Sequence, residues 1–190
     1  MAKPERRSAC ATVAMVVSAV LLWGSVTSGQ AAAAAPRDPC ATRPSACPDV
    51  RFLYDYAYGL GFHPFTEPHA VRELLTDHFW LFPVSGGCRH GDLYVGRECD
   101  LLGGNPVRVE LVGDDFLQID TLPGHDLGSD LHIRFTFSRS LGLHFLNVRA
   151  WQNSPEEYRE HRLRSEAGRL FAWPLWAVLA ETLTVAAYGA

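Results

Sequence analysis

Hydrophobic residues change their spacing along this chain near Phe79. Before that point they recur every three or four positions, which predicts two amphipathic helices. The first helix covers Asp49 to Leu60 and ends at Gly61; its apolar positions are Val50, Leu53, Tyr54, Ala57 and Tyr58. The second has Thr66 as its cap and Pro68 in its first turn; its repeating positions are Val71, Leu74, Leu75 and His78.

Strand patterns follow from Phe79 onward. Two stretches, 79–84 and 92–102, precede a segment in which Val107, Val109 and Leu111 alternate with polar residues. This period of two is that of a strand with one polar face. A tight turn at 113–115 then leads into a strand at 116–122.

The clearest strand covers Leu131 to Ser138, and a second covers Leu143 to Trp151. Pairing Ser138 with Leu143 predicts an antiparallel hairpin in which Phe135 lies beside Leu146. This register keeps one face of the hairpin largely apolar and the other largely polar.

A long helix is predicted at the C-terminus. Ser154, Pro155, Glu156 and Glu157 form a helix start with a capping box, and the helix kinks or restarts near Pro174. Its apolar side carries Leu163, Ala167, Leu170, Phe171, Trp176, Leu179 and Leu183. The predicted fold class is therefore α+β: two N-terminal helices, an antiparallel sheet of five or six strands, and a long C-terminal helix packed on the sheet.

The first 35 residues have the pattern of a secretory signal peptide. A charged start is followed by an apolar run from Ala9 to Trp23, too short for a membrane span of ~20 residues, and by alanines at 31–35. We expect cleavage between Ala32 and Arg37 and a secreted, extracellular protein. Residues 36–48 then form an extended segment that leads into a single α+β domain at 49–190.

Four cysteines remain after cleavage: Cys40, Cys47, Cys88 and Cys99. An even number in an exported domain predicts two disulfides, and three pairings are open. Proximity along the chain favours Cys40 with Cys47 and Cys88 with Cys99; long-range pairing is the alternative. The spacing does not match a structural zinc site, and we predict neither a metal nor a cofactor.

Charge and composition exclude several classes of function. Loss of the leader removes three positive residues and one negative residue, which moves the formal net charge from −4 to −6, and it removes Lys3, the only lysine. Schiff-base chemistry and a Walker-type phosphate loop are therefore excluded, and we expect no nucleic-acid partner. We also expect no stable membrane anchor after cleavage, and the oligomeric state is left open.

Two motifs carry a resemblance. Thr121-Leu-Pro-Gly-His125 is followed by Gly128, Ser129 and Asp130, and Val148-Arg-Ala-Trp151 leads to Ser154-Pro155. This resembles an uncharacterised helix-grip family, within the START and polyketide-cyclase superfamily, with T-L-P-G-H-P-E and V-R-A-F-S-R-P motifs. Asp126 and Leu127 replace its Pro-Glu, and the similarity covers roughly 107–187. The resemblance implies a curved sheet wrapped around the last helix and an apolar ligand cavity, and it implies no reaction.

Candidate site residues follow from this expected cavity. Its ligand-binding wall would include Ile133, Phe135, Val148, Leu170, Phe171 and Trp176. The catalytic candidates are His125, Asp126, Asp130 and Arg149, because a histidine oriented by a carboxylate can transfer protons near neutral pH. Pro and Gly at the centre of Leu122–His125 also fit a purely structural type II turn.

Three functions remain open at this point. The first is a non-enzymatic module that binds a small apolar ligand between the sheet and the last helix. The second is a cyclase-like or hydrolytic enzyme that uses His125 with Asp126 or Asp130. The third is a cell-surface protein-interaction domain without a cavity.

Overall fold

The computed structural model describes residues 50–153 and 162–188. Its strands are β1 (Arg51–Phe62), β2 (Glu98–Leu101), β3 (Asn105–Val112), β4 (Phe116–Thr121), β5 (Leu131–Ser140) and β6 (Leu143–Gln152). Its helices are α2 (Pro68–Asp77), the short 3₁₀ helices η2 (Phe79–Leu81) and η3 (Gly86–Arg89), and α4 (Arg162–Tyr188). The leader, Cys40, Cys47 and the predicted helix start at Ser154–Glu157 lie outside the described residues.

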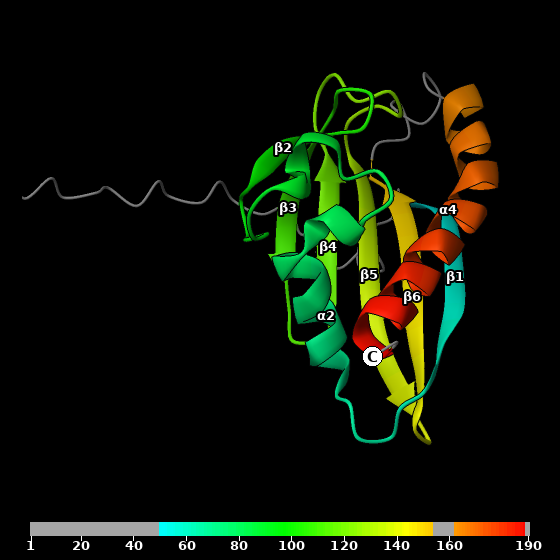
Figure 1. The fold of residues 1–190 in the computed structure, drawn as a ribbon. Helices are drawn as coiled ribbons and strands as arrows, with labels where there is room; N and C mark the ends of the chain where they lie inside the picture. The colour runs from blue at the N-terminus through cyan, green and yellow to red at the C-terminus, as the bar shows by residue number, and fades with distance from the viewer. Residues whose placement is uncertain (1–49, 154–161, 189–190) are drawn as a thin grey trace, which may run out of the picture. The chain divides into compact units, whose positions relative to one another are not determined.

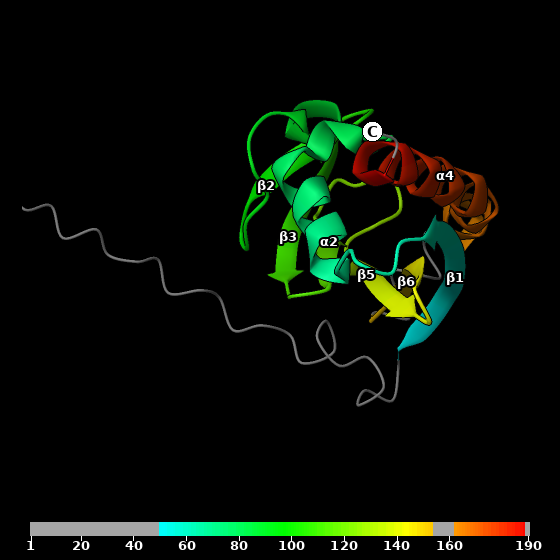
Figure 2. The ribbon, with the colours of Figure 1, turned by 60° about the horizontal axis from the view of Figure 1, so that its bottom comes forward.

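The six strands form one antiparallel sheet in the order β1-β6-β5-β4-β3-β2. Both α-helices lie on the same face of this curved sheet, α4 along β1 and α2 over β4 and β5 (Figures 1 and 2). The predicted α+β class, with a long C-terminal helix on an antiparallel sheet in a helix-grip-like arrangement, is confirmed.

The helix predicted at Asp49–Leu60 is wrong in its type, because Arg51–Phe62 forms the edge strand β1. The same residues also satisfy a period of two, since Tyr54, Tyr56, Tyr58 and Leu60 alternate with outward positions. Short apolar runs fit either period, and pairing with β6 along almost the whole segment decides for the strand.

The predicted β5–β6 hairpin is confirmed, with a register two residues away from the predicted one. Ser140 pairs with Leu143, which sets Phe135 beside Val148. The two turn residues, Leu141 and Gly142, both have positive φ angles of 52° and 82°, as in the tight turns that match strand twist. A shift of two leaves every side chain on its predicted face.

The stretches 79–84 and 92–102 contain less strand than predicted. They include η2, and β2 covers four residues. The predicted disulfide between Cys88 and Cys99 is present and joins η3 to β2, with the two Cα atoms 5.2 Å apart. Arg97 also donates hydrogen bonds to loop carbonyls, including that of Gly91 at 2.8 Å.

Helix α2 begins with Pro68 in its first turn, as predicted, although Glu67 rather than Thr66 is its N-cap residue. Helix α4 continues through Pro174, which lies on its exposed side. There the carbonyl of Leu170, which loses its helical partner, can be hydrated. By length and composition, Glu166–Tyr188 could cross a membrane, and 28% of its most apolar window is buried.

The core is solid under the second half of α4. Leu179 and Leu183 are fully buried there. The Trp176 ring packs 5.1 Å from Phe135 and 5.5 Å from Phe82, measured between ring centroids. Counted from the C-terminus of α4, Trp176 is the last large side chain that points into this core. The first half of the helix is packed differently.

Candidate functional site

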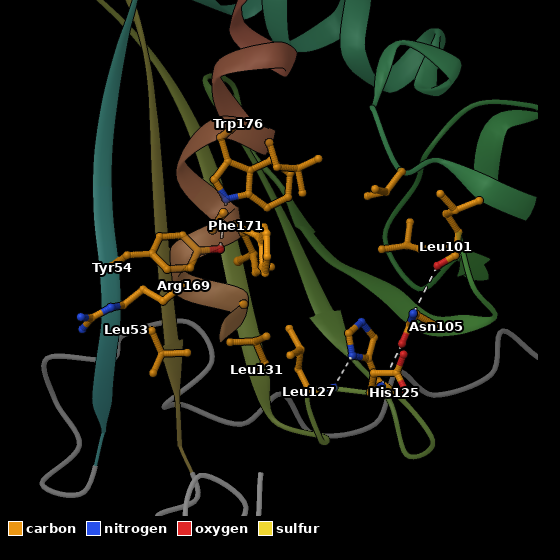
Figure 3. A pocket seen from close by; sticks show the side chains of 17 residues that line it. Leu53, Tyr54, Leu101, Asn105, His125, Leu127, Leu131, Arg169, Phe171 and Trp176 are labelled. Carbon is orange, nitrogen blue, oxygen red and sulfur yellow. Dashed lines mark hydrogen bonds between the residues drawn. The ribbon is translucent and has the colours of Figure 1, made fainter. Parts of the chain in front are cut away.

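A cavity of about 260 Å³ lies between the first half of α4, the start of β1 and two loops (Figure 3). Most of its wall is aliphatic or aromatic. The lining residues are Leu53, Tyr54, Val84, Leu101, Leu102, Asn105, His125, Asp126, Leu127, Leu131, Ile133, Gly168, Arg169, Phe171, Ala172, Leu175 and Trp176. The volume is slightly below the ~300 to 1,000 Å³ of common ligand pockets.

Small residues on the inward side of α4 leave this space unfilled. Gly168 and Ala172 lie one turn apart and both line the cavity. Leu127 packs so close to Gly168 that a Cβ there would lie 3.3 Å from the leucine methyl carbon. The helix therefore approaches the loop closely at Gly168, and Ala172 leaves the adjacent volume open.

Three tyrosines on β1 hold α4 in place beside the cavity. Tyr56 and Tyr58 donate hydrogen bonds to the carbonyls of Arg169 and Trp173, at 3.3 and 2.8 Å. The Tyr54 hydroxyl instead accepts a hydrogen bond from Nε1 of Trp176 at 3.1 Å. Burial raises the pKa of Tyr54, so its hydroxyl stays protonated at neutral pH.

An irregularity in β1 turns its first residues toward the cavity. The register with β6 shifts between Phe52 and Tyr54, so Leu53 is an additional residue in the strand. A bulge of this kind lets two consecutive side chains serve one face. Leu53 and Tyr54 accordingly both line the cavity.

The loop between β4 and β5 supplies the opposite wall. Its turn closes with a hydrogen bond from the His125 amide to the Leu122 carbonyl at 3.1 Å, and Gly124 has a φ of 99°. These are the features of the type II turn that the sequence predicts. The side-chain oxygen of Asn105 accepts a hydrogen bond from the Asp126 amide at 2.8 Å, which fixes the loop against β3.

His125 projects from this loop into the cavity (Figure 3). Its Nδ1 accepts a hydrogen bond from the Leu127 amide at 3.1 Å, so in the neutral ring the proton is on Nε2. Burial lowers the pKa of His125 from 6.5 to about 4, against the opposing effect of Asp126. At neutral pH the imidazole is therefore uncharged, and its lone pair is already engaged.

Of the four catalytic candidates, the structure brings His125 and Asp126 together at the cavity. Asp130 is exposed in a left-handed conformation, with a φ of 61°, and is not part of the wall. Arg149 lies on the outer face of the sheet and pairs there with Asp55. The arrangement thus lacks an assembled group of histidine and two carboxylates.

The predicted ligand-binding residues fall into three places. Ile133, Phe171 and Trp176 line the cavity. Phe135 and Val148 are fully buried in the solid core, and Leu170 is 75% exposed on the far side of α4. Bulky residues of the helix were expected to line the cavity, whereas the inward side of α4 carries small ones there. Gly168 and Ala172 were therefore not predicted.

A second polar cluster lies on the outer face of the sheet. Nδ1 of His132 is 2.9 Å from Oδ1 of Asp120, and both side chains are almost fully buried. Gln118 donates to Asp120 at 3.0 Å and accepts from Arg134 at 2.7 Å. The cluster is a buried hydrogen-bond network, and the sheet separates it from the cavity.

Within the described parts of the chain, no three histidine, cysteine, aspartate or glutamate side chains are grouped so that they could hold a metal ion. The polar groups at the cavity are a neutral histidine, a tyrosine, an asparagine, an aspartate and an arginine. Chemically, this set can orient a ligand by hydrogen bonds.

No protein-family model matches the sequence, and no curated protein is similar to it. Several solved structures overlap it in part. A Mesorhizobium loti protein has 15% identity and a TM-score of 0.46, over 68% of this chain and 96% of that chain. A Mycobacterium smegmatis protein has 12% identity and a TM-score of 0.44, over 69% and 87%. The di-domain ARO/CYC StfQ of the steffimycin biosynthetic pathway has 14% identity and a TM-score of 0.35, over 80% and 56%.

Proposed function

We propose that this chain is an exported protein that binds a small apolar ligand in the cavity between α4, β1 and the β4–β5 loop. The observation that carries this proposal is the cavity itself, which is bordered mainly by apolar side chains and contains few polar groups. The leader pattern supports export, and the T-L-P-G-H motif supports kinship with the uncharacterised helix-grip family.

Two other hypotheses are less well supported. A protein-interaction domain was expected to be solid, whereas this domain is hollow under the first half of α4. Proton abstraction by His125 would need a free ring lone pair, which the Leu127 amide occupies. Proton donation would need a charged ring, which the lowered pKa of about 4 disfavours at neutral pH. A binding module therefore accounts for the cavity with the fewest additional assumptions.

Native mass spectrometry of the protein purified from culture medium tests the proposal directly, because a bound ligand adds a discrete mass. A second test uses tetralin, a bicyclic hydrocarbon, as a probe of the cavity. Ala172→Leu adds three carbon atoms to the cavity wall and should weaken tetralin binding at least tenfold. Ala167→Leu makes the same change at an exposed position of α4 and is the matched control.

Equal tetralin affinity in the two variants would contradict binding in this cavity. A parent protein that carries no added mass and binds no tetralin would contradict the proposed function as a whole.

A further inference from the structure

At two residues of the cavity wall, existing hydrogen bonds occupy an acceptor atom and leave a donor hydrogen unused. Tyr54 and His125 both belong to the wall, on opposite sides of it (Figure 3). Each has one polar atom engaged by a neighbouring group, and each retains one hydrogen that is not used in that contact.

The Tyr54 oxygen accepts the indole N–H of Trp176 at 3.1 Å. A phenol has one hydrogen to donate, and among the described residues no acceptor is found for it. The Tyr54 side chain points from β1 into the cavity, with its oxygen toward the interior (Figure 3). This hydroxyl is therefore available as a donor to a ligand.

His125 also has an engaged acceptor atom and an unused donor hydrogen. Since Nδ1 accepts the Leu127 amide at 3.1 Å, Nε2 carries the hydrogen, and the described residues contain no acceptor for it. Because burial lowers the pKa of the ring, this donor is uncharged at neutral pH.

The remaining polar groups disfavour other ligand classes. Asn105 accepts from the Asp126 amide and donates to the Leu102 carbonyl at 3.2 Å. Arg169 is half exposed and lies 3.7 Å from Glu166, so its charge is partly compensated. Asp126 adds negative charge at the rim, which disfavours an anionic ligand.

We propose that the cavity selects neutral apolar molecules with carbonyl-type oxygens, which accept hydrogen bonds from the Tyr54 hydroxyl and from Nε2–H of His125. This inference rests on the proposed binding function and names its ligand class. Ketones, esters and quinones belong to this class, whereas carboxylates do not.

The test compares 1-tetralone, a neutral ketone, with tetralin, which has the same carbon skeleton without the oxygen. The quantity measured is the ratio of the two affinities, because it cancels changes in cavity shape that affect both probes. Tyr54→Phe should lower the tetralone preference roughly fivefold, the value of one ordinary hydrogen bond. Tyr56→Phe is the matched control, since its hydroxyl bonds to the Arg169 carbonyl and does not line the cavity.

His125→Phe should lower the same ratio, and ¹³C-carbonyl-labelled tetralone should show a downfield shift in the parent protein that is reduced in both variants. Tetralin binding with an affinity ratio that neither variant changes would overturn the inference and leave the proposed function standing. Binding of neither probe to the parent protein would overturn both.

Discussion

Replacement of Phe171 by alanine tests whether this ring lines a cavity or belongs to the packed core. The ring lines the cavity and is nevertheless 72% exposed, whereas Phe135 is fully buried. A phenylalanine offers roughly 200 Å² of surface, so the buried part is roughly 55 Å² and its loss costs about 1.4 kcal/mol at ~25 cal/mol per Å². Alanine's higher helix propensity recovers roughly 0.5 kcal/mol, which leaves a net cost of about 1 kcal/mol.

Phe135→Ala is the comparison, since loss of a fully buried ring costs ~3 to 5 kcal/mol. Urea unfolding of Phe171→Ala should give a midpoint lower by roughly 0.5 M at an m-value of ~2 kcal/mol/M. The same variant should change tetralin affinity, because it widens the cavity.

A cost of 3 kcal/mol or more for Phe171→Ala would refute this reasoning, because the ring would then belong to the core. Unchanged stability together with unchanged tetralin affinity would refute it in the other direction, since the ring would touch neither core nor cavity.

Three further predictions concern other parts of the chain. Because burial lowers the pKa of His125 to about 4, the unfolded chain binds more protons below pH 6.5; stability should fall from pH 6.5 to 4, and His125→Gln should lose less over this range, as measured by urea unfolding. The Cys88–Cys99 bridge, with a sequence separation of 11, should contribute roughly 2 to 3 kcal/mol; a double alanine variant with an unchanged unfolding midpoint argues against that. N-terminal sequencing of the secreted protein should find a start between Ala32 and Arg37, and a retained Met1 contradicts cleavage.

Local patterns in the sequence were sufficient where one interpretation of the spacing was dominant. The hairpin strands, the Leu122–His125 turn and the Cys88–Cys99 pair all involve residues close together in the chain. Their geometry depends on turn chemistry and alternation, which a short window of sequence contains.

The candidate site was only partly predictable, because a short window of sequence shows some of its residues and not others. His125 was found because a Pro-Gly turn presents it, and Trp176 because it is a large apolar residue on a helix. Gly168 and Ala172 give no comparable signal, since a small residue in a helix is equally compatible with an exposed face. Tyr54 was assigned to a helix, so its role in the wall could not be anticipated.

The sequence by itself determined the α+β class and the hairpin faces and favoured the disulfide between Cys88 and Cys99, because each follows from local spacing or turn chemistry. Only the tertiary structure decided that residues 51–62 form an edge strand, since pairing with a segment about 90 residues away resolves a pattern that fits both periods. It also decided which side of α4 faces the sheet, and so where the cavity lies. The hydrogen bond from Trp176 to Tyr54 depends on that packing, because it joins α4 to a strand that is 122 residues away in the sequence.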